Sequence, residues 1–434
     1  MTVLAAMPKY EAYKDSGVEW IGDISSDWDI KPGFIAYSEN KRNNKGLKEE
    51  KVLSLSYGKI IVKAKEKLVG LVPESFETYQ IVEPGDIIIR CMDLQNDKTS
   101  LRIGLAENHG IITSAYLNLK VKSNFNPKFI YYYLHSLDTT KVLYKFGTGL
   151  RQNLSFSDFY RLPIFDISKS LQTDITNYLD NKTAQIDEAI AIKKKQIELL
   201  KERKQILIQK AVTQGLDPNI PMRDSGVDWI GEIPEHWELK RLKYVVSIIK
   251  RIIGYEGPDV LSITQRGIKV KDISSGEGQL AMNYSKYQIV NRGDFAMNHM
   301  DLLTGYVDIS KFDGVISPDY RVFTSINKEV DDQYLLLLFQ IGYKHKVFYG
   351  FGQGVSLLGR WRLPADNFNN FKIMIPPLKE QLEVSRYIND ESVKIDNTAA
   401  IQQKQIEKLK EYKTTLINSA VTGKIKIEGN ADDA

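Results

Sequence analysis

The chain has a single cysteine, Cys91, among its 434 residues. One cysteine excludes an internal disulfide framework and any zinc site with several cysteine ligands, which suits a reducing compartment. We expect a small buried side chain at Cys91 rather than a reactive thiol, because no flanking motif marks a nucleophile. Long apolar runs are missing too: "YLLLLF" at residues 334–339 is far too short to span a bilayer. We therefore expect a soluble, cytoplasmic protein.

Catalytic motifs are also missing. The sequence contains no GxxxxGK(S/T) phosphate loop, no GxGxxG, no HExxH and no Cys-x-x-C. "NPKF" at residues 126–129 approaches the Asn-Pro-Pro-aromatic motif of amino-methyltransferases, but Lys128 replaces the second proline, so we interpret it as a helix start. The five histidines are scattered without metal-ligand spacing. We predict a chain that is not an enzyme and binds neither a metal nor a cofactor.

The overall charge favours no class of partner. Lys and Arg number 59 against 55 Asp and Glu, which leaves a formal charge of +4. Affinity for a polyanion must therefore come from local patches of the surface. The length suggests about three domains at roughly 150 residues each, and 42% hydrophobic residues suffice for substantial cores.

The chain is built twice. "KDSGVEWIGDISSD" at residues 14–27 recurs as "RDSGVDWIGEIPEH" at residues 223–236, and Trp229 minus Trp20 gives an offset of 209. The same offset joins two helical segments that end in "AVT", at Thr213 and Thr422. Inside each half, between its tryptophan segment and its helix, the repetition continues with small insertions and deletions. For example, "YQIVEPGD" at residues 79–86 returns as "YQIVNRGD" at residues 287–294. This is a tandem duplication, not a short-period solenoid, and its order is globular domain, helix, globular domain, helix.

The two helical segments carry matching apolar stripes at spacings of three, four and seven. Neither segment contains glycine or proline. Roughly 35 residues make a rod of about 50 Å, which should pack against a partner helix, and the nearest partner is the other copy. Lys204 and Lys413 occupy corresponding positions and suit a snorkelling or register-setting role. The predicted packing residues are Ile186, Ile190, Ile197, Leu200 and Leu207 in the first helix and Ile395, Ala399, Ile406, Leu409 and Leu416 in the second.

The globular halves are predicted to mix strands with one helix each, an α+β class. Polar, aromatic and basic residues follow the strand ends in matched places of both halves. Arg, Asn and Gln can make two hydrogen bonds to a base edge, and Lys suits phosphates, although ordinary solvated loops have the same composition. The candidate DNA-binding residues are Arg90, Asp93, Gln95, Asn96, Lys98, Tyr116, Arg151 and Gln152 in the first half and Asn298, His299, Asp301, Tyr320, Arg321, Gln353, Ser356 and Arg360 in the second.

Two related domains with a common frame and different loops, joined by helical rods, suit a molecular caliper. Each domain would read its own short sequence, and the rods would set the distance between the two. "DSGVEWIG" fits a packed part of the frame better than a ligand site, because a Trp-Ile-Gly run leads to a second tryptophan. Two rivals stay open: a DNA-modifying enzyme with an unrecognised site, and a helical adaptor whose domains bind proteins.

The sequence resembles the specificity subunit of type I restriction-modification enzymes over essentially its whole length. The resemblance is carried by the doubled "DSGVEWIG" and "DSGVDWIGEIPEHWEL" segments, by "GVISPDY", by "RLPADNFNNFKIMIPPLKEQ" and by the two helices that end in "AVT". It implies a non-catalytic subunit of a phage-defence system, with two target-recognition domains that bind double-stranded DNA at a split site. It also implies antiparallel helices that set the spacer and dock methyltransferase subunits, two in number. S-adenosylmethionine would be bound by those subunits, and ATP with magnesium by a restriction motor.

The duplicated frame gives the expected domain boundaries, and the first half departs from the family's pattern at its junction with the helix. The first half has "FDISKSLQ" at residues 165–172 where the second half has the typical "IPPLKEQ". The run of Lys193, Lys194 and Lys195 likewise has no equal in the second helix, where Gln402 and Gln403 precede Lys404. The expected segments are an opening segment at 1–29, recognition domains at 30–166 and 239–375, a central helical spacer at 167–215, a repeated opening segment at 216–238, a C-terminal helical spacer at 376–424 and a tail at 425–434.

Overall fold

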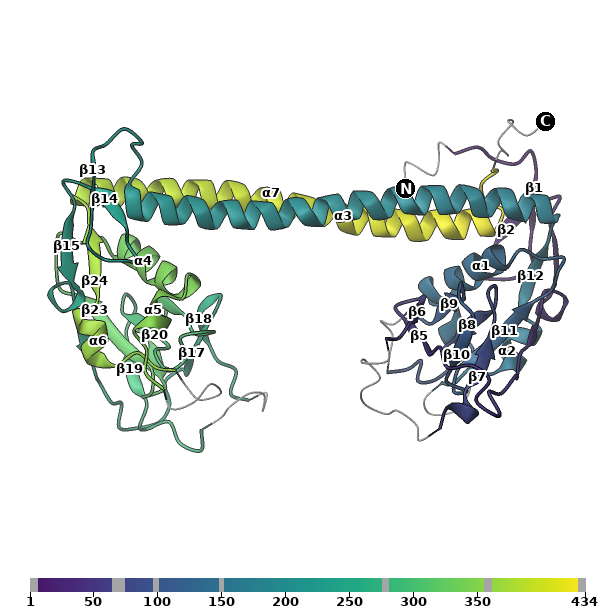
Figure 1. Ribbon diagram of the computed structural model, residues 1–434, viewed down its shortest axis with the longest axis horizontal. Coiled ribbons are helices and arrows are strands. Elements are labelled where there is room, and N and C mark those ends of the chain that lie inside the picture. The colour runs from purple at the N-terminus through teal and green to yellow at the C-terminus, as the bar shows by residue number, and fades with distance from the viewer. Residues whose placement is uncertain are drawn as a thin grey trace. The chain divides into compact units, whose positions relative to one another are not determined.

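The computed structural model describes residues 7–64, 75–96, 101–147, 152–274, 281–354 and 361–427. It divides into two compact units. The first comprises Met1–Lys194 with Gln402–Ala434, and the second comprises Lys195–Ile401. Each unit holds one globular α+β domain and a segment of each of two long helices, α3 (Lys169–Gln214) and α7 (Leu378–Val421) (Figure 1).

The domain of the first unit is built around a small antiparallel sheet. Its order is β4-β11-β8-β9, and β8 consists of three isoleucines that are all buried, as expected of an inner strand. Helix α1 (Pro127–Thr139) begins where the sequence predicts, because Asn126 caps it and Pro127 occupies its first turn. The strands are β1 (Tyr13–Asp15), β2 (Asp23–Ser25), β3 (Asp29–Pro32), β4 (Tyr37–Glu39), β5 (Leu53–Ser56), β6 (Lys59–Val62), β7 (Gln80–Val82), β8 (Ile87–Ile89), β9 (Ile103–Leu105), β10 (Gly110–Ile112), β11 (Leu117–Val121) and β12 (Pro163–Asp166), with a short helix α2 (Phe156–Tyr160).

The second unit repeats this topology. Its sheet has the order β16-β23-β20-β21, which matches the first strand for strand, and α4 (Asp332–Lys344) takes the place of α1. The duplication seen in the sequence is therefore a duplication of fold. The strands are β13 (Met222–Asp224), β14 (Glu232–Pro234), β15 (Glu238–Arg241), β16 (Val246–Ile249), β17 (Leu261–Thr264), β18 (Gly267–Val270), β19 (Gln288–Val290), β20 (Phe295–Met297), β21 (Val307–Ile309), β22 (Gly314–Ile316), β23 (Arg321–Ser325) and β24 (Lys372–Ile375), with short helices α5 (Val347–Gly350) and α6 (Ala365–Asn370).

Each doubled segment leads to a tryptophan that is buried in this frame. Trp28 and Trp237 are each only 1% exposed. The Trp28 ring lies 5.2 Å from that of Phe165 on β12, and a Cβ at Gly423 would come within 2.9 Å of it. In the second unit the Trp237 indole donates to Glu380 in the first turn of α7, at 3.0 Å. These contacts tie each domain to the helices beside it and support the structural interpretation of the repeated segment.

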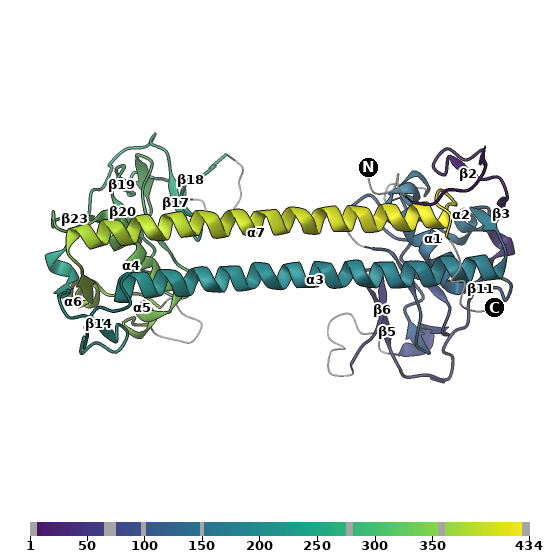
Figure 2. The same ribbon diagram turned by 90° about the horizontal axis from the view of Figure 1, so that it is seen from above.

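Within each unit the segments of α3 and α7 run side by side (Figure 2). In the first unit the ammonium of Lys413 lies 2.7 Å from both carboxylate oxygens of Asp187, and Lys193 donates to Gln402 at 3.1 Å and to Gln405. The partners fall in number along α7 as α3 advances, so these segments are antiparallel. Lys204 pairs with Asp396 at 2.7 Å in the second unit. Since 413 minus 204 and 396 minus 187 both give 209, the two ion pairs are copies of one another.

The predicted packing stripe faces inward. Of its members, Ile186, Ile190, Ile395, Ile406 and Leu416 are buried, and the remaining five are half-buried. No helix in the described ranges is long and apolar enough to cross a membrane. Cys91 is buried, as expected, and burial raises the pKa of its thiol to about 12, which removes it as a nucleophile near neutral pH.

Candidate nucleic-acid interface

Two loops of the first unit meet just after strand β8. The amide of Leu154 donates to the carbonyl of Cys91 at 2.8 Å, and that of Leu94 donates to the carbonyl of Gln152 at 3.4 Å. The amide of Asp93 donates to the Asn153 side chain at 2.9 Å. The structure thus brings together the predicted residues that lie on these two loops, namely Arg90, Asp93, Gln95, Asn96 and Gln152.

A buried arginine supports this loop from inside the domain. Arg102 is 0% exposed, and its guanidinium donates to the carbonyls of Met92 at 2.7 Å and Asp93 at 3.0 Å. These bonds hold Asp93 in a left-handed conformation with φ of 58°, which costs a non-glycine residue free energy unless its surroundings fix it. The sequence analysis missed Arg102. The one sequence signal for Arg102 is its place immediately before the apolar strand β9.

The second unit holds its loops with equivalent backbone bonds. The amide of Leu363 donates to the carbonyl of His299 at 2.9 Å, and that of Leu302 donates to the carbonyl of Trp361 at 3.2 Å. By position along the duplication, His299 corresponds to Cys91, Leu302 to Leu94, Leu363 to Leu154 and Trp361 to Gln152. Gln353 joins the same region, because it exchanges backbone bonds of 2.8 and 3.1 Å with Arg362. The loop frame is therefore shared while its side chains differ.

The predicted residues of the second loop are ordered by local bonds. The Asp301 carboxylate accepts from the amides of Leu303 and Thr304, both at 3.0 Å, and lies at the surface. Asn298 is half-buried, and its carbonyl accepts from the Tyr343 hydroxyl at 2.7 Å. Burial lowers the pKa of His299 to about 4, with the positive charges of Arg321 and Arg362 adding to the effect, so this ring is neutral near pH 7.

Tyr116 and Tyr320 lie on a separate turn of each domain. Each is half-buried against the small apolar cluster beneath that turn. The Gln80 side chain donates to the carbonyls of Thr113 at 3.0 Å and Tyr116 at 2.6 Å, and Gln288 makes the same pair of bonds to Ser317 and Tyr320. Both glutamines belong to the repeated "YQIV" stretch, so the duplication was the signal for them.

Arg321 is the predicted site residue that the structure places elsewhere. It is 6% exposed, donates to the carbonyl of Leu363 at 2.9 Å and stacks 4.5 Å from the Phe368 ring centre. Burial lowers the pKa of its guanidinium to about 10, which still leaves it charged. Arg321 therefore supports the second loop from within, as Arg102 supports the first. The predicted residues Lys98, Arg151, Ser356 and Arg360 lie outside the described residues.

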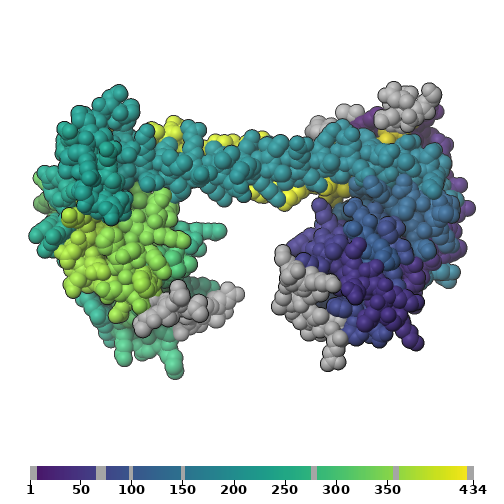
Figure 3. Space-filling view, viewed as in Figure 1, coloured from purple at the N-terminus to yellow at the C-terminus, as the bar shows by residue number. Residues whose placement is uncertain are grey.

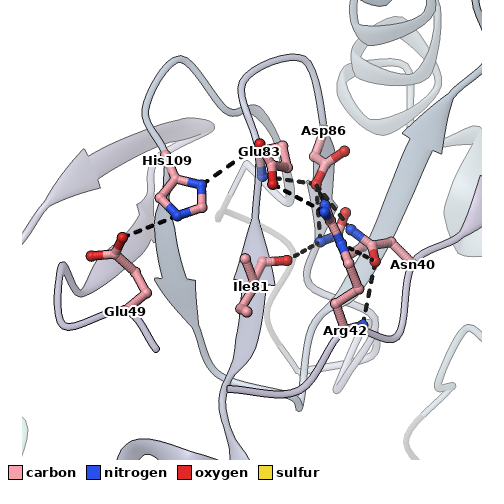
Figure 4. Close-up of polar contacts among 8 residues, drawn as sticks. Asn40, Arg42, Glu49, Ile81, Glu83, Asp86 and His109 are labelled. Carbon is pink, nitrogen blue, oxygen red and sulfur yellow. Dashed lines mark hydrogen bonds and ion pairs between the residues drawn. The ribbon is translucent and has the colours of Figure 1, made fainter. Parts of the chain in front are cut away.

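A polar cluster anchors the turn that leads into β8 (Figure 4). The Asp86 carboxylate accepts from the Asn40 side chain at 3.0 Å and from the Glu83 amide at 3.0 Å, while Arg42 pairs with Glu83 at 3.0 Å. Burial raises the pKa of Asp86. Arg42 also lies 3.8 Å from the Asp86 carboxylate, and the second unit keeps this pair as Arg251 with Asp294. The cluster holds the turn before β8 and so helps to position the loop that follows this strand.

Comparison with known proteins finds similarity to one family. Residues 234–411 match the family model of the type I restriction modification DNA specificity domain. The putative type I restriction enzyme MjaX specificity subunit of Methanocaldococcus jannaschii is 23% identical over 455 residues, 99% of this chain and 100% of the relative. The MjaVIII specificity subunit of the same organism is 24% identical over 344 residues, 74% of this chain and 75% of the relative.

Solved structures share the fold. A chain from a type I restriction-modification system, studied for its complex assembly and conformational transition, superposes with a TM-score of 0.65 at 14% identity, covering 93% of this chain and 99% of that one. The HsdS subunit from Thermoanaerobacter tengcongensis gives 0.52 at 13% identity, covering 93% and 98%. The family model and the two curated relatives confirm the resemblance to type I restriction-modification specificity subunits that was found in the sequence.

Proposed function

We propose that the chain is the DNA-recognition subunit of a type I restriction-modification complex and reads a split target, with residues 30–166 on one half-site and residues 239–375 on the other. The observation that carries this proposal is the shared loop frame with different side chains. The boundaries agree with the strand pairs β3 with β12 and β15 with β24, which close the two domains.

The loop side chains have the chemistry for base reading. Arg90 and Asn298 occupy equivalent positions directly after β8 and β20; arginine pairs with two acceptors of guanine, and asparagine with the edge of adenine. Aspartates follow at the equivalent positions 93 and 301, and carboxylates accept from cytosine. The proposed contact set keeps the remaining residues named from the sequence and leaves out Arg321, because its guanidinium is buried.

The long helices carry the second part of the proposal. They form an antiparallel coiled coil that sets the gap between the half-sites and docks two methyltransferase subunits, and restriction subunits join through these. An exposed apolar stripe supports docking on α3, where Ile192, Leu199 and Ile206 recur every seven residues and are 52%, 51% and 59% exposed. The chain itself supplies no catalytic group in this proposal, since its partners bind S-adenosylmethionine and ATP.

Methylation mapping tests this function directly. The chain is co-expressed with its neighbouring methyltransferase subunit in a methylation-free host, and modified bases are mapped across the genome by single-molecule sequencing. We expect a split motif with a constant gap. A stable complex that leaves no motif would favour a protein-binding adaptor, and modification by the chain without its partner would favour an enzyme.

Domain exchange assigns the half-sites. Residues 30–166 are replaced by the corresponding domain of a relative, and the motif is mapped again. We expect only one half of the target to change, because each loop frame is built within a single domain. A change in both halves would contradict the assignment of one domain to each half-site.

A further inference from the structure

A buried glutamine joins three segments where each domain meets its long helix. Gln172 lies in the first turn of α3 and Gln381 in the first turn of α7, and 381 minus 172 gives the offset of 209. Both side chains are 0% exposed. The first junction departs from the typical "IPPLKEQ" sequence, yet Gln172 keeps the position and the bonds of its counterpart.

Two bonds are common to both units, and Gln381 also donates to the Glu329 carbonyl at 2.9 Å. Gln172 accepts from the Asn126 amide at the start of α1, at 2.7 Å, and donates to the Ile167 carbonyl after β12, at 2.9 Å. Gln381 accepts from the amide of Asp331, the cap of α4, at 2.8 Å, and donates to the Pro376 carbonyl after β24, at 2.7 Å. A strand end, the start of a long helix and the start of the domain helix thus meet at one side chain.

Further side-chain bonds join each domain helix to the long helices. In the first unit the Asn126 side chain donates to Thr173 at 3.2 Å, and Tyr132 on α1 donates to Asp180 on α3 at 2.7 Å. In the second unit Ser385 donates to Asp331 at 3.1 Å, and Tyr334 on α4 donates to the Val212 carbonyl at 3.0 Å. The space-filling view shows the first domain in direct contact with α3 (Figure 3).

We propose that Gln172 and Gln381 are positioning residues that fix the direction in which each recognition domain leaves its helix, and thereby hold the half-sites at one gap. Pivoting the domain on the helix would break bonds at a fully buried side chain and leave buried backbone groups unpaired, which is costly. Neither glutamine contacts DNA in this role. The inference rests on the proposed function and adds to it a determinant of spacing that lies outside the recognition loops.

The test uses the full chain with its methyltransferase partner and maps methylation for Gln381→Met and Gln172→Met. Methionine keeps the length of the side chain and removes its hydrogen bonds. We expect unchanged half-sites, with methylation at gaps one base pair longer or shorter rising at least about tenfold, which corresponds to about 1.4 kcal/mol of lost discrimination. The matched controls, Gln209→Met and Gln403→Met, alter exposed glutamines of the same two helices and should keep a single gap.

Each outcome decides between the two ideas. A wild-type complex without a split motif overturns the proposed function. A wild-type split motif with a single gap that survives in both methionine variants overturns the positioning role alone, as does a variant that loses the sequence of one half-site. Should a methionine variant fail to fold, Gln172→Glu and Gln381→Glu keep the accepting oxygen and lose the amide that donates to the carbonyl after the strand, and a single gap in both of these would equally count against the proposal.

Discussion

The two recognition domains agree in their backbone and differ in how they support it. Both join the loop after the central strand to a second loop through equivalent amide-to-carbonyl bonds, at Cys91 with Leu154 and at His299 with Leu363. The buried arginine beneath comes from the start of β9 in the first domain, as Arg102, and from β23 in the second, as Arg321. The two copies therefore share a loop path but differ in the residues on it and under it, which suits the proposed reading of two different sequences.

The largest expected effect tests whether the long helices, and not the domains, set the gap between the half-sites. Deleting one heptad within residues 186–211 should shorten the gap, and the matched deletion of 192–198 and 401–407 preserves both copies of the Lys-Asp pair. Seven residues at 1.5 Å span about 10 Å, or roughly three base pairs. Methylation mapping should therefore show both half-sites unchanged and a gap about three base pairs shorter. An unaltered gap would remove the caliper role of the helices.

The next effect concerns the buried arginines beneath the loops, Arg102 and Arg321, each of which should act on its own domain alone. Arg102→Met removes the bonds that the guanidinium donates to the part-buried carbonyls of Arg90, Met92 and Asp93, and we expect a loss of about 2 kcal/mol in the free energy of unfolding together with weakened recognition of the first half-site alone. Arg321→Met should act in the same way on the second half-site. Urea unfolding and methylation mapping measure the two effects.

Arg102→Lys is the matched control. Lysine keeps the charge but lacks the planar guanidinium that donates to these carbonyls at once. It should therefore restore little of the lost stability and recognition. Recognition lost equally at both half-sites in either methionine variant would show that the arginines do not act within their own domains.

The sequence predicted the parts of this fold that repeat. The offset of 209 located the tryptophan frame, the two long helices and their packing stripe, because a duplicated core preserves its spacing. It also marked Gln80 and Gln288 in "YQIV" without revealing that they brace the tyrosine turns. The sequence did not mark Arg102 and wrongly predicted that Arg321 faces DNA, since an arginine in the sequence looks the same whether it faces solvent or donates to carbonyls inside the domain. That choice depends on loop paths that only the folded backbone fixes.

The smallest expected effect is on the pH dependence of stability and comes from two histidines that burial keeps neutral, His135 and His299. Burial lowers the pKa of His135 to about 4, with the positive charge of Lys413 adding to the effect, and Tyr131 stacks on its ring at 5.5 Å. The pKa of His299 falls to about the same value. Because both pKa values are lower in the folded state, the unfolded chain takes up protons first as the pH falls below about 6.5. The stability present above that pH is therefore lost progressively toward pH 4.

Thermal unfolding of the full chain between pH 7.5 and 4.5 measures this loss. We expect Tm to fall across the window beyond what the carboxylates cause, by about 2–4 °C for each kcal/mol lost. His135→Asn in the first unit and His299→Asn in the second should each flatten the dependence, since asparagine takes up no proton. The two units differ in where the neutral ring lies, on the domain helix in one and on the recognition loop in the other. An acid response that neither substitution changes would show that these rings are not its source.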